Sequence, residues 1–250
     1  DVMAGPMERR SKGWQLNLAE CDKTSLNDFK VAIWSNDELA PVSKEIAQRC
    51  EEVGNQLNSV GTTVSFAAKP EHDFMKAEIN YQLLLQSVMQ SGLPEDEYQK
   101  IEKLASSLDK NDLSVDAILA KGTVLSHRNW IRQNYAREQI KISWSKFFEE
   151  WDVLICPQLA TTAIEHDHRK ISERTVMVDN QEQRYFQQIF WPGLAVNAHL
   201  PSTVFPTGLS ADGMPIGLQV IGGAYEDKTT IKFAELYEEE FKAFVVPNLD

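Results

Sequence analysis

The short apolar run before Pro157 is the feature that most constrains the fold of this chain. Residues 153–156 read Val-Leu-Ile-Cys, and Pro157 ends the run. A stretch of this length that is apolar at every position, without alternation, is typical of a strand covered on both faces. Such a strand needs helices on both sides of its sheet, so the run predicts an α/β layered architecture.

A β-α-β unit is predicted upstream of this run. Phe29–Trp34 and Thr62–Phe66 are rich in β-forming residues, and Pro41–Leu57 between them has apolar residues along one helical face. Pro41 suits the first turn of that helix. The arrangement predicts two parallel strands joined by a right-handed crossover.

The middle of the chain is predicted to be helical. Apolar residues recur at helical spacing in Asp73–Gln90, Pro94–Leu108 and Asp116–Trp151. Gly122 is a candidate break in the third of these tracts.

Beyond Pro157 the pattern predicts alternating loops, strands and helices. The expected segments are a polar loop at Gln158–Glu173, a strand at Arg174–Val178, a helix at Arg184–Asn197, strands at Ser202–Phe205 and Ile216–Ile221 with a turn at Ser210–Gly213, and a helix at Asp227–Phe241. We therefore predict one domain over residues 1–250, with residues 1–28 as an irregular lead-in. Asp1–Pro6 is typical of the end of an apolar helix closed by Gly-Pro, so we expect further chain before it.

The charge balance excludes some partners. The 250 residues include 37 acidic and 25 basic side chains, a net charge of −12. Such a surface repels nucleic acid and anionic membranes, and no apolar run is long enough to span a bilayer. The three cysteines are scattered and form no CxxC pair, which indicates neither a disulfide framework nor a zinc site. We expect a cytoplasmic protein.

No catalytic motif within the chain is convincing. Gly-x-Ser-x-Gly, His-Glu-x-x-His, the phosphate loop and Gly-x-Gly-x-x-Gly are all absent from the sequence. Ser143 and Lys146 fit a Ser-x-x-Lys pattern, but Ser107 and Lys110 fit it equally, and the motifs that accompany it in β-lactamases are missing. His166 and His168 have no further cluster of ligand residues nearby in sequence. We predict no metal and no cofactor.

Several blocks in the second half of the chain together resemble the amidase signature family. They are Trp151–Pro157, Leu200–Gly208, Asp212–Gly222 and Tyr225–Thr230, and they occur in the order in which that family has them. Physically, the first three are buried strands and turns held by Pro and Gly, and the fourth is the acidic start of a helix. The resemblance implies part of an α/β/α sandwich with a mixed β-sheet flanked by helices, here its C-terminal portion.

The resemblance also implies an activity. The family hydrolyses carboxylic amides to an acid and an amine or ammonia with a Ser–Ser–Lys triad, in which one serine attacks, a second relays the proton and lysine is the base. These elements lie in the family before the equivalent of Asp1, and this chain contains no Gly-Gly-Ser-Ser run. We therefore assign no catalytic residue and predict that these 250 residues alone are inactive.

Five residues are candidates for binding a small-molecule amide substrate. The resemblance places the loop after Pro157 beside the substrate cleft, so Gln158, Leu159 and His166 are candidates there. Phe190 and Trp191 are candidates for an apolar wall. Two alternatives remain open. Gln158, Leu159 and His166 can be ordinary loop residues, and the two aromatic side chains can belong to the hydrophobic core.

A non-catalytic role is the competing hypothesis. A truncated or split-subunit remnant would act only in binding or assembly. In either case half of a domain exposes an apolar edge and face, so we expect a homo-oligomer or a complementing N-terminal half.

Overall fold

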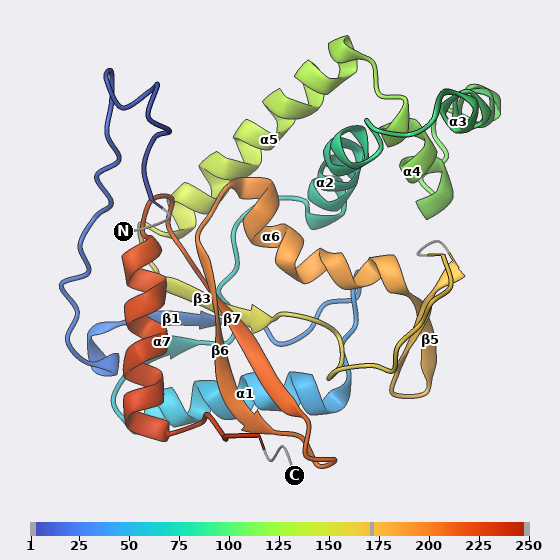
Figure 1. Ribbon diagram of the computed structural model, residues 1–250. Coiled ribbons are helices and arrows are strands. Elements are labelled where there is room, and N and C mark those ends of the chain that lie inside the picture. The colour runs from blue at the N-terminus through green and yellow to red at the C-terminus, as the bar shows by residue number, and fades with distance from the viewer. Residues whose placement is uncertain (1–3, 171–172, 248–250) are drawn as a thin grey trace.

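A five-stranded mixed sheet forms the centre of the protein (Figure 1). The computed structural model describes residues 4–170 and 173–247. The strands, in their order across the sheet, are β2 (Thr63–Ser65), β1 (Lys30–Ile33), β3 (Val153–Pro157), β7 (Pro215–Gly222) and β6 (Ser202–Leu209). Strand β1 is parallel to β2 and β3, whereas β7 is antiparallel to β3 and β6. The predicted parallel pair and the mixed α/β sheet are confirmed.

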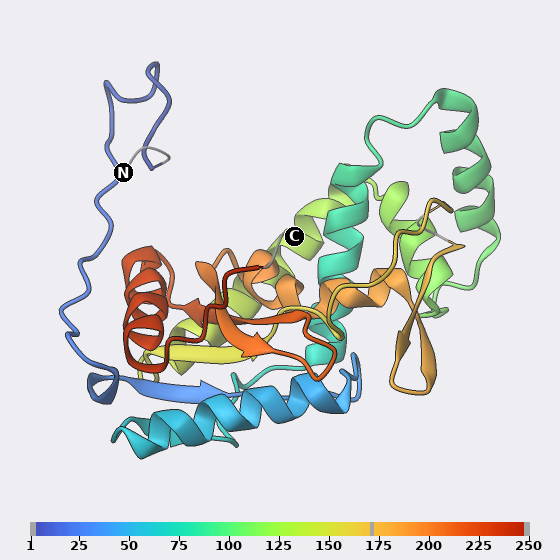
Figure 2. The same ribbon diagram turned by 60° about the horizontal axis from the view of Figure 1, so that its bottom comes forward.

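Helices cover both faces of this sheet. The helices of the described residues are α1 (Lys44–Ser59), α2 (Phe74–Met89), α3 (Glu95–Ser107), α4 (Val115–Thr123), α5 (His127–Phe147), α6 (Phe190–Ala198) and α7 (Asp227–Phe241), of which α1, α5, α6 and α7 pack on the sheet. The described residues also form the short 3-10 helices η1 (Leu26–Asp28) and η3 (Tyr185–Ile189) and a separate hairpin of β4 (Thr175–Val178) and β5 (Gln181–Arg184). Figures 1 and 2 show α2, α3 and α4 extending beyond the sheet as a helical arm.

One sheet face packs against α1 and α7. Strand residues alternate, so that Val31, Val153 and Leu218 point toward this face. They meet Val53 and Leu57 of α1 and a group of aromatic side chains. The aromatic group is Phe29, Phe205, Phe233 and Tyr237. Each fully buried side chain of this size contributes about 1.5–3 kcal/mol.

The opposite face packs against α5 and α6. Trp34, at the end of β1, is fully buried, and its ring centroid lies 5.4 Å from that of Trp191 and 6.2 Å from that of Phe190. Leu154 of β3 and Trp144 of α5 belong to the same cluster. Because β3 is buried at every position, the prediction of a strand covered on both faces is confirmed.

A buried glutamine ties three elements together on this second face. Gln219 of β7 is 1% exposed. Its Nε2 donates to the carbonyls of Pro157 at 3.0 Å and Trp191 at 2.8 Å, and its Oε1 accepts from Ser202 Oγ at 3.1 Å. The amide thus hydrogen-bonds two buried carbonyls, and it fixes the end of β3 against the start of α6.

Some predicted boundaries are wrong. Helix α1 begins after Ser43, whose Oγ accepts from the Ile46 N–H, so Pro41 lies before the cap and not in the first turn. The middle tract is broken at residues 124–126 and not at Gly122, because Ser126 caps α5. Arg184 belongs to β5, and a 3-10 turn precedes α6, so the predicted helix at Arg184–Asn197 starts too early.

Within the segment expected as an irregular lead-in, residues 4–25 contain no helix or strand, and the 3-10 helix η1 follows them. Asp1–Met3, half of the segment interpreted as a helix end, lie outside the described residues. Among the described helices, none is long and apolar enough to cross a bilayer.

The connection from β2 to α2 is anchored on α5 by a histidine. His72 Nδ1 lies 3.1 Å from Ser143 Oγ, and the imidazole packs against Phe74 with ring centroids 4.4 Å apart. Burial lowers the pKa of His72 to about 4, because the charged imidazolium loses its hydration there.

We expect Gln219→Leu to destabilise the fold by about 2–4 kcal/mol, because it removes the buried hydrogen bonds of Gln219 to Pro157, Trp191 and Ser202. Urea unfolding followed by circular dichroism measures the change. Gln48→Leu, on the exposed face of α1, is the matched control and should shift stability by less than about 0.5 kcal/mol. Equal effects of the two substitutions would contradict the assigned role of Gln219.

A second prediction concerns the pH dependence of stability. Well above pH 6.5 the imidazole of His72 is neutral in both folded and unfolded states. As the pH falls toward 4, the unfolded state binds the proton more readily, so stability is lost in that window. His72→Gln should reduce this loss between pH 7 and pH 4. Ser143→Ala, which keeps the buried imidazole, should preserve it; urea midpoints across pH test both.

Candidate functional site

The loop after β3 is anchored near its start by two backbone hydrogen bonds of Ala160. The Ala160 N–H donates to Gln188 Oε1 at 2.9 Å, and the Ala160 carbonyl accepts from the Ser43 N–H at 2.8 Å. These bonds join the loop to η3 and to the start of α1. Gln158 is half-buried and Leu159 is 45% exposed, so both predicted residues lie at the surface end of the sheet, next to a fixed backbone.

His166 lies farther along this loop and is exposed. Its ring lies near that of His168, with centroids 6.2 Å apart. The intervening Asp167 is paired with Arg169, which lowers the pKa of that carboxyl to about 2. Among the described residues no group of three His, Cys, Asp or Glu side chains is placed to hold a metal.

Trp191 is fully buried at the start of α6. Its Nε1 donates to the Ala40 carbonyl at 3.1 Å, and its ring packs edge-on against Phe190 with centroids 5.2 Å apart. The indole of Trp191 therefore has its hydrogen bond and its packing partners within the core. Trp191 can support residues that line a pocket, but its own side chain does not reach the surface.

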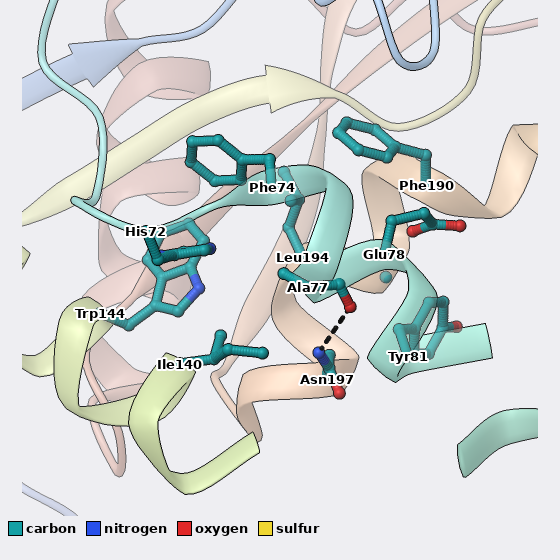
Figure 3. Close-up of a pocket in the computed structure, with 11 residues that line it drawn as sticks. His72, Phe74, Ala77, Glu78, Tyr81, Ile140, Trp144, Phe190, Leu194 and Asn197 are labelled. Carbon is teal, nitrogen blue, oxygen red and sulfur yellow. Dashed lines mark hydrogen bonds between the residues drawn. The ribbon is translucent and has the colours of Figure 1, made fainter. Parts of the chain in front are cut away.

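Phe190 lines a small cavity between α2, α5 and α6 (Figure 3). The space is about 20 Å³, enough for one water molecule. Other side chains around it are His72, Phe74, Glu78, Tyr81, Ile140, Trp144, Leu194 and Asn197. Of the five predicted binding residues, all within the described part of the chain, Phe190 alone lines this cavity.

Burial dominates the electrostatics of the cavity. It raises the pKa of Tyr81 to about 12 and also raises the pKa of Glu78, whose Oε1 accepts from Gln82 Nε2 at 2.7 Å. Asn197 Nδ2 donates to the Ala77 carbonyl at 3.3 Å, which ties α6 to α2 (Figure 3). Gly193 permits the close approach of α6 to Tyr81 of α2, since a Cβ at Gly193 would lie 2.5 Å from Tyr81 Cε1.

These polar residues were not predicted from the sequence. Glu78 and Tyr81 are three positions apart on one helix, and Asn197 lies in an apolar helix. A polar residue inside an apolar helical pattern was the available signal. Such a polar residue is equally consistent with packing between helices and with a functional site. The sequence does not distinguish the two, because only the tertiary structure places α2 against α6.

The Ser-x-x-Lys candidates do not form a nucleophilic site. Ser143 contacts His72, but it lies within α5, where backbone N–H groups are used by the helix and cannot stabilise an oxyanion. Ser107 Oγ donates to the Leu104 carbonyl. Burial raises the pKa of the Cys50 and Cys156 thiols, which makes both unreactive.

The comparisons with known proteins give one consistent family. The family model described as Amidase matches residues 1–231. A glutamyl-tRNA(Gln) amidotransferase subunit from Oceanobacillus iheyensis is 26% identical over 241 residues, and its counterpart from Thermosynechococcus vestitus is 34% identical over 111 residues. These alignments cover 89% and 44% of this chain, and 47% and 21% of the relatives.

Solved structures have the same fold. The glutamyl-tRNA(Gln) amidotransferase subunit from Thermotoga maritima superposes with a TM-score of 0.67 at 16% identity, covering 98% of this chain and 51% of that one. A bacterial aryl acylamidase of the amidase signature enzymes has a TM-score of 0.61 at 17% identity, with coverages of 85% and 44%. The chain spans about half the length of the relatives that match most of it. It belongs to the amidase signature family.

Proposed function

We propose that this chain is the C-terminal portion of an amidase domain that hydrolyses a carboxylic amide to an acid and an amine or ammonia. The observation that carries the proposal is the family match over residues 1–231 of a chain that contains no Gly-Gly-Ser-Ser run. The nucleophilic serine, the relay serine and the lysine base then belong to a complementing portion. In the reaction, the serine oxygen attacks the amide carbon, the amine leaves with a proton, and water releases the acid.

In this proposal the chain supplies part of the substrate pocket. Gln219 holds the end of β3 beside Trp191, which supports a fixed position for the loop that follows. Gln158, Leu159 and His166 would border the substrate from this loop. Phe190 and Trp191 would back the pocket as an apolar wall.

We propose water as the acceptor of the acyl group. Several relatives are named as subunits of a glutamyl-tRNA(Gln) amidotransferase, which makes amidotransfer the second candidate. The net charge of −12 opposes contact between this chain and a phosphate backbone. The buried thiols of Cys50 and Cys156 suit a reducing compartment, and we propose that the protein acts in the cytoplasm.

The free edge of β6 supports a complementing N-terminal portion as the partner. Strand β6 is the last strand on its side of the sheet and is eight residues long, whereas the other edge strand, β2, has three. A long unpaired edge is a template for another strand. Arg49 donates to the carbonyls of Thr207 and Leu209, so part of this edge is already occupied, and within the described part of the chain no strand pairs with residues 202–205 on this side.

The register identifies which groups of β6 are free. The Gly222 N–H donates to the Pro201 carbonyl at 3.1 Å, and Thr203 lies opposite Val220. Since bonded and outward-facing residues alternate in an antiparallel ladder, the peptide groups of Ser202 and Val204 face the open edge. The Val204 side chain is also 53% exposed. We propose that a strand of the triad-carrying portion pairs here.

The activity test compares the chain alone with the chain joined to the triad-carrying portion of its own domain. We expect no hydrolysis of aliphatic or aryl amides above background by the chain alone, because it lacks the nucleophile. The joined protein should accelerate hydrolysis by about 10⁶-fold or more, measured as ammonia or aniline released without an added acceptor. A folded joined protein without activity would favour the non-catalytic remnant.

The edge test uses two substitutions at one position. Val204→Pro removes an outward N–H and should abolish association with the triad-carrying portion, measured by analytical ultracentrifugation. Val204→Ala removes most of the side chain but keeps the N–H, so association should weaken by less than about tenfold. Both variants should melt as the unmodified chain does when alone. Association that survives Val204→Pro would exclude pairing at this edge.

A further inference from the structure

A second and larger cavity lies where the helical arm meets the β4–β5 hairpin. Its volume is about 250 Å³. It is bounded by α2, by the start of α4 with the loop before it, and by η3. The apolar side chains that line it include Ile79, Leu113, Val115, Ile118 and Phe186. This cavity is separate from the small one beside Phe190, although Glu78 contacts both.

The mouth of this cavity is apolar. Met75 of α2 is 50% exposed, Leu113 before α4 is 60% exposed, and Val115 at the start of α4 is 46% exposed. Single exposed apolar side chains are common, but here three segments contribute them to one opening. Apolar side chains gathered around a concavity indicate a binding site.

The size of the cavity limits its ligand. An enclosed apolar cavity of about 150 Å³ is sufficient to bind benzene. A space of about 250 Å³ therefore admits a molecule with one aromatic ring and a short substituent. Larger ligands would have to displace Phe186 or the loop before α4.

The carboxylate of Glu78 lines this cavity and has no basic side chain paired with it among the described residues. Glu78 Oε1 accepts from Gln82 Nε2 at 2.7 Å, and no ion pair to Glu78 is present among the described side chains. Arg184, also at the cavity, makes two bonds to Asp116 at 2.7 and 3.0 Å and so neutralises that carboxylate instead. A half-buried carboxylate beside an apolar surface favours a cation that can replace its lost hydration.

We propose that this cavity binds a small hydrophobic amine, with its ring among Ile79, Leu113 and Ile118 and its ammonium group donating to Glu78. The occupant is a monovalent organic cation with one ring. Its binding requires no catalytic residue and does not depend on the proposed hydrolysis.

The test measures binding of three ring compounds to the full chain by isothermal titration calorimetry and NMR. Benzylamine, benzyl alcohol and benzoate share a ring but differ in charge. We expect benzylamine to bind at least about tenfold more tightly than benzyl alcohol, with no detectable binding of benzoate. In Glu78→Gln, benzylamine and benzyl alcohol should bind equally, because the advantage of the ammonium group is lost.

Val115→Trp supplies a second, independent variant. Val115 is at the mouth, so an indole there should fill the cavity and abolish benzylamine binding while the fold is retained. Val88→Trp, at an exposed site of α2 outside the cavity, is the matched control and should bind benzylamine as the unmodified chain does.

Four results would overturn the proposal. They are absence of benzylamine binding, equal binding of benzyl alcohol to the unmodified chain, binding that persists in Val115→Trp, and loss of binding in Val88→Trp. Because the readout is binding, amide hydrolysis can fail or succeed independently.

Discussion

The side-chain amide of Gln219 is the contact on which the arrangement of this fold depends. Its two N–H groups reach the carbonyl that ends β3 and a carbonyl in the first turn of α6, while its oxygen accepts from the first residue of β6. In sequence these three contacts lie 17, 28 and 62 residues from Gln219. A buried amide that satisfies all of them fixes their relative position more strictly than apolar packing does, because hydrogen bonds have direction. The loop after Pro157 therefore leaves the sheet from a defined point.

The two edge strands of the sheet differ in how many of their outward backbone groups have partners among the described residues. At β2 the edge is short, whereas at β6 the edge is long and only its second half is covered, by the guanidinium of Arg49 at a bulge where Gly208 has φ of +109°. A positive φ of this size suits glycine and bends the strand. The open half of β6 and the apolar mouth beside α4 are two places where the fold leaves groups unsatisfied. The first consists of backbone groups that can pair with a strand, and the second combines apolar side chains with a carboxylate that can hold a small cation.

Sequence reasoning predicted the elements well wherever the core side chains were apolar. The strand at 153–157 and the helix Asp227–Phe241 were both predicted, because their burial follows directly from their pattern. Strand β5 was missed, since Gln181–Arg184 is polar throughout and pairs only because β4 lies opposite. Asp179 and Asn180 between them were the available signal, as both tolerate the φ of +52° that Asp179 adopts.

For the site, the sequence by itself determined the family and the absence of a Gly-Gly-Ser-Ser run, because ordered Pro and Gly turns and short motifs are properties of local sequence. Only the tertiary structure decided which side chains meet. Trp191 faces the core and His166 the solvent, although both were candidates for one pocket. Glu78, unremarkable in sequence, lies between two cavities. The physical reason is that burial and charge pairing depend on contacts between distant segments, which no local pattern contains.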